Sequence, residues 1–113
     1  MDLSSNFSGE IQIITAEANR IDAAVAIQFK DRMRSVTDGG PTRVILDLSR
    51  VDFIDSSGLG AIVASMKQLG ADRKLELAGL SPTVDKVFRL TRMDTVFAIH
   101  PSIEAAFGAD HDL

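Results

Sequence analysis

The chain has 113 residues, a hydrophobic content of 45% and a net charge of −4. This length predicts one domain, and the acidic balance argues against direct nucleic-acid binding, because neutralising phosphates needs a clustered basic face. Cysteine is absent, histidine occurs twice, and no apolar run approaches the roughly 18 to 20 residues of a membrane-spanning helix. We therefore expect no metal site and no membrane insertion, and the lack of a signal peptide pattern predicts a cytoplasmic protein.

Along the chain, segments with the apolar spacing of a strand alternate with segments that have the apolar spacing of a helix. Strands are expected near residues 10–16, 43–48, 73–78 and 96–99, with residues 1–9 as a frayed start or a short edge strand. Helices are expected over 23–36, between Ser57 and Gly70, from Pro82, and from 102 to about 107. This order predicts a single α/β domain with a mixed central sheet of about five strands and about four helices. We expect its core to span about 9–107 and residues 108–113 to form a flexible tail.

Two helix starts carry cap residues. Asp22 precedes the first amphipathic helix, where its carboxylate is expected to accept hydrogen bonds from amides of the first turn. Ser81 followed by Pro82 is a cap with proline at the first helical position. These residues predict where the first and third helices begin.

The junction Asp55-Ser56-Ser57-Gly58-Leu59-Gly60 follows the buried strand 43–48, at a strand end where binding sites commonly form. One interpretation of Ser56 is a plain helix cap, worth about 1 kcal/mol. However, Gly58 and Gly60 weaken the first helical turn by up to about 1 kcal/mol each. Glycines let another surface approach closely, and this surface is either the sheet itself or a partner. The neighbouring Val51, Phe53 and Ile54 are read as core residues or as a docking rim.

The residues of the junction give little indication of a catalytic site. A serine nucleophile needs a nearby base, but the junction has no histidine, and His100, which precedes proline, is interpreted as a loop residue. The third glycine of a dinucleotide fingerprint is also missing. A receiver-like domain phosphorylated on Asp55 is an alternative, although the acidic pair that would hold magnesium is absent. We therefore expect a protein that is not an enzyme and has no cofactor.

The junction, with the preceding strand 44–48 and the segment 51–54, resembles the STAS-domain anti-sigma-factor antagonists. Residues 20–24 are similar to a turn of that family, and residues 77–88 to its third helix. The resemblance covers nearly the whole chain and implies a single STAS domain over 1–113. Asn19 departs from the pattern, because the family usually has glycine there.

The resemblance implies a phosphorylation switch. An anti-sigma factor that is also a serine kinase, of the histidine-kinase-like ATPase type, would bind the unphosphorylated protein, release its sigma factor and phosphorylate Ser56. A PP2C-type phosphatase would reset the switch. The implied partner-binding residues are Asp22, Asp55, Ser56, Ser57, Gly58, Leu59 and Gly60. Whether Ser57 can substitute for Ser56 stays open.

Two other functions compete with this interpretation. A STAS subunit of a lipid-transport ABC system would use the same helix face as a constitutive contact. A small-molecule sensor would bind a phosphate or a nucleotide at the turn of residues 58–60. Neighbouring genes would separate the transporter from the switch, and a thermal-shift screen with GTP and ATP would test the sensor.

Overall fold

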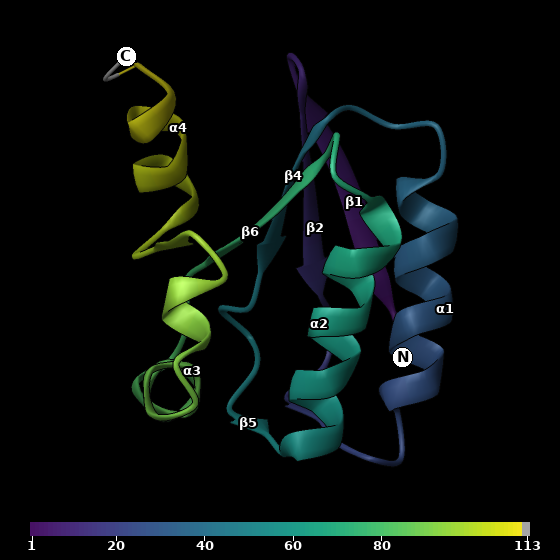
Figure 1. The fold of residues 1–113 in the computed structure, drawn as a ribbon, viewed down its shortest axis with the longest axis vertical. Coiled ribbons are helices and arrows are strands. Elements are labelled where there is room, and N and C mark those ends of the chain that lie inside the picture. The colour runs from purple at the N-terminus through teal and green to yellow at the C-terminus, as the bar shows by residue number, and fades with distance from the viewer. Residues whose placement is uncertain (112–113) are drawn as a thin grey trace.

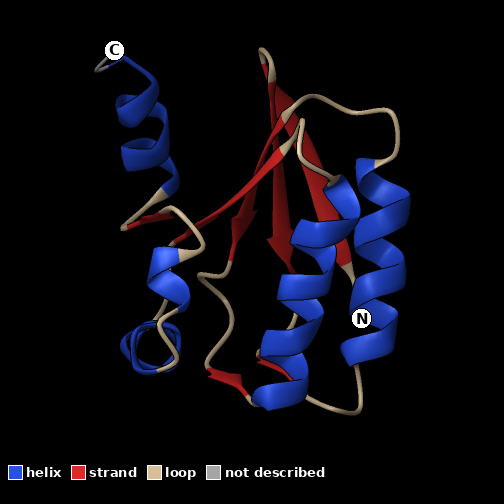
Figure 2. Ribbon diagram, viewed as in Figure 1, coloured by secondary structure: helices blue, strands red, loops and turns tan. Residues whose placement is uncertain are grey.

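A five-stranded mixed sheet forms the centre of the computed structural model, which describes residues 1–111. The strand order is β1-β2-β4-β6-β7, and all neighbours are parallel except the antiparallel pair β1 and β2. The strands are β1 (Leu3–Ser8), β2 (Ile11–Ala16), β4 (Arg43–Asp47), β6 (Lys74–Ala78) and β7 (Ile99–His100). The predicted mixed sheet is confirmed, and residues 3–8 form an edge strand (Figures 1 and 2).

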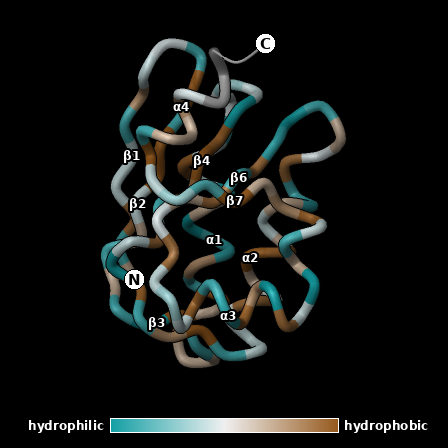
Figure 3. The backbone as a smooth tube through the Cα atoms, turned by 90° about the vertical axis from the view of Figure 1, so that its left-hand side faces the viewer, coloured by the Kyte–Doolittle hydropathy of each residue, from teal (hydrophilic) through white to brown (hydrophobic). Residues whose placement is uncertain are grey.

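Four α-helices cover the sheet, as predicted: α1 (Ala26–Thr37), α2 (Ser56–Leu69), α3 (Pro82–Leu90) and α4 (Ile103–His111). Figure 1 shows α1 and α2 side by side in front of the strands. Figure 3, turned by a quarter, shows α4 on the other side of the sheet from α2. No helix within residues 1–111 has the length and apolar character needed to cross a bilayer.

The alternation of side chains along the strands produces two apolar layers. Val44 and Leu46 on β4 point into the large core with α1, α2 and α3, whereas Ile45 points to the opposite face and packs in a smaller cluster with Ala106 of α4. All four side chains are fully buried. The continuous apolar run in β4 is thus explained by burial on both faces.

Two element starts differ from the sequence prediction. α1 begins at Ala26 and is preceded by Val25, which makes no side-chain cap. Asp22 does not cap this helix, because its carboxylate instead accepts from the amide of Ala24 and from Arg20. α2 begins at Ser56, one residue earlier than predicted.

The C-terminal part also differs from the prediction. A left-handed residue, Arg92, and a short 3₁₀ helix, η1 (Met93–Thr95), follow α3, and Phe97 is buried against Phe88 with ring centroids 6.0 Å apart. This packing holds residues 96–98 outside the strand, so β7 starts only at Ile99. α4 continues to His111, since a single glycine at 108 costs a helix only about 1 kcal/mol. Of the predicted tail, residues 112–113 lie outside the described residues.

A second, two-stranded sheet was not anticipated. β3 (Arg20–Ile21) pairs in parallel with β5 (Phe53–Ile54). Each strand has only two residues, so neither has enough alternation to be recognised in the sequence. This pairing brings the loop before α1 against the loop before α2.

Candidate functional site

The candidate site lies where the loops after β2 and β4 meet at the carboxyl edge of the sheet. Two backbone hydrogen bonds join these loops in addition to the β3–β5 pair. The amide of Asp52 donates to the carbonyl of Asn19 at 2.8 Å, and the amide of Asp55 donates to the carbonyl of Ile21 at 3.4 Å. Figure 1 shows β5 and the first turn of α2 beside the segment that leads into α1. The backbone contacts fix the predicted site residues 22 and 55–60 close to one another.

Asp55 links the two loops through its carboxylate. Its Oδ1 accepts from the amide of Gly58 at 2.9 Å, which makes Asp55 the N-cap of α2. Its Oδ2 accepts from the amide of Ala23 at 3.2 Å, in the loop that carries Asp22. Because both oxygens accept backbone hydrogen bonds, Asp55 holds the start of α2 against the neighbouring loop.

Ser56 and Ser57 occupy the first two positions of α2, and both are exposed. The interpretation of Ser56 as the cap is therefore wrong, because the carboxylate of Asp55 takes that role. A serine whose side chain is exposed and does not cap the helix can accept a modification without removing the cap. The structure thus places two neighbouring hydroxyl groups at the surface.

The two glycines of the junction have different roles. A Cβ on Gly58 would lie 1.9 Å from the carbonyl oxygen of Ile21, so this buried glycine is required for α2 to pack against β3. A Cβ on Gly60 would meet no atom within 4 Å, and this glycine is exposed. The idea that both glycines leave room for a partner is wrong for Gly58, because packing inside the molecule already fills that space.

An exposed aromatic residue and a cation flank the junction. Phe53 is 39% exposed, and the guanidinium carbon of Arg20 lies 4.6 Å from its ring centroid. The same arginine donates from Nε to Asp22 Oδ2 at 3.2 Å. Val51 and Ile54 are buried, so of the three apolar loop residues only Phe53 belongs to the surface. Sequence reasoning did not find Arg20, although an arginine paired with an aspartate two residues later was a visible signal.

Leu59, the remaining predicted contact residue, is partly buried and packs against the large core. The described surface around the junction therefore consists mainly of Ser56, Ser57 and Gly60, with Phe53 and Arg20 beside them. It is a mixed surface of hydroxyl groups, one aromatic ring and the opposite charges of Arg20 and Asp22.

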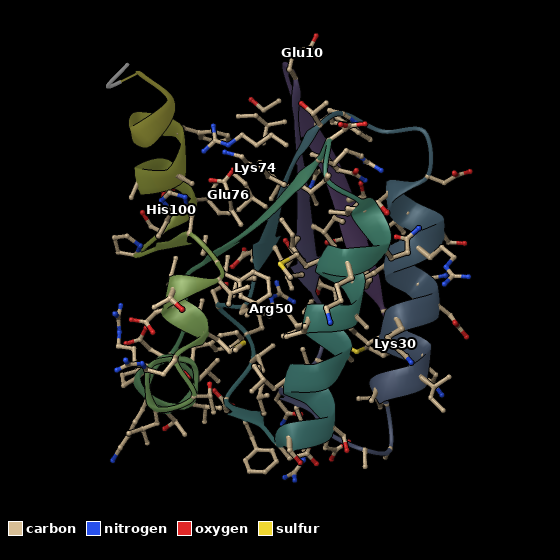
Figure 4. The ribbon with its side chains drawn as sticks, viewed as in Figure 1. Glu10, Lys30, Arg50, Lys74, Glu76 and His100 are labelled. Carbon is tan, nitrogen blue, oxygen red and sulfur yellow. The ribbon has the colours of Figure 1, made fainter. Side chains whose placement is uncertain are left out.

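A separate ionic cluster lies on the other face of the sheet. Glu76 of β6 accepts from Arg43 Nε at 2.5 Å and Nη2 at 2.9 Å, and His100 Nε2 lies 2.7 Å from Glu76 Oε1. Arg43 Nη2 also donates to the carbonyl of Ala106 in α4 at 2.8 Å. In Figure 4 the side chains of Glu76 and His100 come from adjacent strands and lie next to each other. His100 is therefore a strand residue with a buried partner, and its interpretation as a loop residue is wrong.

The environment of Glu76 shifts its pKa. Burial alone would raise the pKa of this carboxyl, but hydrogen bonds from Arg43 and His100 and their charges outweigh burial and hold the pKa below its usual range. A charge in the middle of a strand with apolar neighbours on both sides was a signal that such a partner exists.

The described residues form no metal site at the junction, and one groove of the molecule lies away from it. Within the described part of the chain, no group of three or more His, Cys, Asp or Glu side chains could hold a metal ion. A groove of about 490 Å³ lies between α3 and β7, and its lining does not include residues 55–60. What the junction offers chemically is a pair of accessible hydroxyl groups next to carboxylates.

Comparison with known proteins agrees with the fold described above. Residues 4–106 match the STAS domain model, so the chain belongs to the STAS domain family. BtrV of Bordetella bronchiseptica, whose name describes an anti-sigma factor antagonist, is 36% identical over 90 residues, covering 79% of this chain and 78% of BtrV. The resemblance seen in the sequence is confirmed.

Solved structures show the same fold. A STAS domain protein from Planctomyces limnophilus matches with a TM-score of 0.86 at 22% identity, covering 96% of this chain and 97% of that chain. The Bacillus cell fate determinant SpoIIAA in its phosphorylated form matches with a TM-score of 0.68 at 23% identity, covering 96% and 98%. Identities this low establish a common architecture only.

Proposed function

We propose that this protein is an anti-sigma-factor antagonist whose binding is switched by phosphorylation of Ser56. The observation that carries the proposal is the position of Ser56, exposed at the first residue of α2 while Asp55 caps the helix. The name of the Bordetella relative and the phosphorylated state of the SpoIIAA structure support the same function. The unphosphorylated protein would bind an anti-sigma factor in the cytoplasm and release the sigma factor.

The switch requires two enzymes that act on this chain. A serine kinase of the histidine-kinase-like ATPase type, which is also the anti-sigma factor, transfers the γ-phosphoryl group of ATP. A bond forms between Ser56 Oγ and the γ-phosphorus, the bond from that phosphorus to ADP breaks, and the hydroxyl proton passes to a base on the kinase. A PP2C-type phosphatase uses water to break the new bond and releases inorganic phosphate.

Charge explains why the phosphate would stop binding. The group adds about −1.5 to −2 charges at neutral pH, at a surface that already carries Asp22 and Asp55. A partner surface suited to a hydroxyl group would then have to desolvate an anion. A loss of about 3 to 5 kcal/mol corresponds to binding weakened some hundred- to several-thousand-fold. Direct obstruction at the interface is sufficient, so the fold itself need not change.

Adjacent serines provide a matched test of the site. After incubation with the kinase and ATP, we expect Ser56→Ala to incorporate no phosphate and Ser57→Ala to incorporate as much as the wild type, measured by intact-protein mass spectrometry. Full incorporation into Ser56→Ala would refute the assignment.

A charge mimic tests the consequence of phosphorylation. Ser56→Asp should bind the anti-sigma factor at least a hundredfold more weakly than the wild type by calorimetry, while its circular dichroism stays native. Ser57→Asp, which carries the same charge one residue further on, is the matched control for position. Unchanged binding of Ser56→Asp would instead fit the constitutive contact expected of a transporter subunit.

A further inference from the structure

Arg20 contacts two neighbours, Phe53 and Asp22, at the edge of the junction. Its guanidinium stacks on Phe53 and contacts Asp22 through a single nitrogen, Nε, at 3.2 Å. The Arg20 side chain in this ion pair is 57% exposed. An exposed arginine with one single-nitrogen ion pair is weakly held and can change partners.

Arg20 and Ser56 lie on the two segments that the junction ties together. Arg20 pairs with Phe53 across the small sheet, and Ser56 lies three residues beyond Phe53. Asp55, next to Ser56, accepts a hydrogen bond from the amide of Ala23. The residue before Ala23 is Asp22, which Arg20 contacts. The arginine and the serine therefore belong to one cluster tied together by backbone and side-chain hydrogen bonds.

The free amides at the start of α2 would not be enough to stabilise a phosphate on Ser56, so a cation would be needed as well. The amide of Gly58 already donates to Asp55 at 2.9 Å, so the phosphate would compete with this carboxylate for it. Asp22 and Asp55 add negative charge nearby. Arginine recognises phosphate through two parallel hydrogen bonds, and a phosphate carries more charge than a carboxylate.

We propose that Arg20 moves from Asp22 and Phe53 to the phosphate when Ser56 is phosphorylated. This inference rests on the proposed function and adds a regulatory residue to it. The change would uncover the Phe53 ring and leave Asp22 without its cation, so the modification would alter three surface residues besides the serine. Arg20 is thus a positioning residue of the switch, not a catalytic one.

The test uses the full chain with phosphoserine inserted at position 56 during translation, so that no kinase is needed. The pKa of the phosphate is measured by ³¹P NMR titration in the wild type and in Arg20→Gln. A guanidinium contact favours the dianion, so we expect the wild-type phosphate to titrate at least about 0.5 pH units below that of Arg20→Gln.

Arg50→Gln is the matched control, because Arg50 is also exposed but pairs with Glu17 at 2.5 Å. It removes the same charge and should leave the phosphate pKa at the wild-type value. Equal phosphate pKa values in the wild type and Arg20→Gln would overturn the proposal, and so would an equal shift in Arg50→Gln.

A second readout follows the arginine itself. In the unmodified protein the Arg20 side-chain protons should resonate upfield, because they lie over the Phe53 ring, and this shift should disappear in the phosphorylated protein. A persistent upfield shift would show that Arg20 has not moved and would overturn the proposal. Binding of the same phosphoprotein to the anti-sigma factor is measured separately, and tight binding there would refute the proposed switch but not the movement of Arg20.

Discussion

At the scale of single residues, Gly58 and Gly60 show how two identical residues in one motif serve different purposes. Gly58 has no room for a side chain because the backbone of Ile21 lies against it, whereas Gly60 faces open space. The motif around Ser56 therefore combines a packing requirement and an accessible surface within three positions of one helix turn.

This difference predicts opposite effects of the same substitution. Gly58→Ala should destabilise the protein by about 3 kcal/mol, because the new methyl group must displace the backbone of β3. Gly60→Ala should stabilise it by about 0.5 kcal/mol, because alanine is the better helix former. Urea unfolding measures both variants. Equal stability of the two variants would show that α2 does not pack against β3 as described.

At the scale of elements, the cluster of Arg43, Glu76 and His100 joins β4, β6 and β7 and extends to α4 through Ala106. Strand pairing alone does not connect α4 to the sheet. The arginine does so by donating to a helix carbonyl while its other contacts hold the carboxylate of Glu76. This hydrogen bond and the packing of Ala106 against Ile45 together hold the last helix on the sheet.

The lowered pKa of Glu76 predicts a dependence of stability on pH. Its pKa in the folded state lies below the unfolded value, which is about 4.3 for glutamate. The contribution is therefore fully present above about pH 4.3 and is lost as the pH falls through the lower, folded value. Glu76→Gln should lose about 2 to 3 kcal/mol near neutral pH, because Arg43 loses its charged partner.

The difference between the wild type and Glu76→Gln should shrink as the pH falls below about 4, measured by urea unfolding from pH 3 to pH 7. Glu10→Gln makes the same change of charge at the exposed tip of the β1–β2 hairpin (Figure 4) and should change stability by less than about 0.5 kcal/mol at pH 7. A difference for Glu76→Gln that is independent of pH would contradict the role assigned to this carboxylate.

At the scale of the whole molecule, one sheet separates two apolar clusters of unequal size. The larger contains Phe88 and the helices α1 to α3, and the smaller contains Ile45 and α4. Since adjacent residues of β4 point into both clusters, neither layer can unfold without disturbing the strand they share. We therefore expect the domain to unfold in one cooperative transition.

Deletions in either cluster should shift that single transition. Phe88→Ala should cost about 3 to 5 kcal/mol and Ile45→Ala about 2 to 4 kcal/mol, since both side chains are fully buried. Phe7→Ala, at a side chain that is 63% exposed, should change stability by less than about 0.5 kcal/mol. Unfolding is followed by circular dichroism in urea. A separate early transition in Ile45→Ala would indicate that α4 forms an independent unit.

Much of the fold could be predicted because its signals are local. The run at β4, the cap formed by Ser81 and Pro82, and the apolar stripe of α2 each depend on residues within one element. The candidate site was also found locally, from a short motif that resembles a known family. Predictions were less accurate at the edges of elements. Asp22 and Asp55 each had a choice of nearby backbone amides, which decides the start of α1 and the cap of α2. The start of β7 depends on the packing of Phe97 against Phe88 in another element.

By itself, then, the sequence determined an α/β domain of the STAS family and pointed to the junction before its second helix. Only the tertiary structure decided that Gly58 serves packing, that Arg20 stacks on Phe53, and that Glu76 joins Arg43 to His100. The physical reason is separation along the chain. Each of these contacts joins residues more than twenty positions apart, and periodicity or capping within one element carries no information about them.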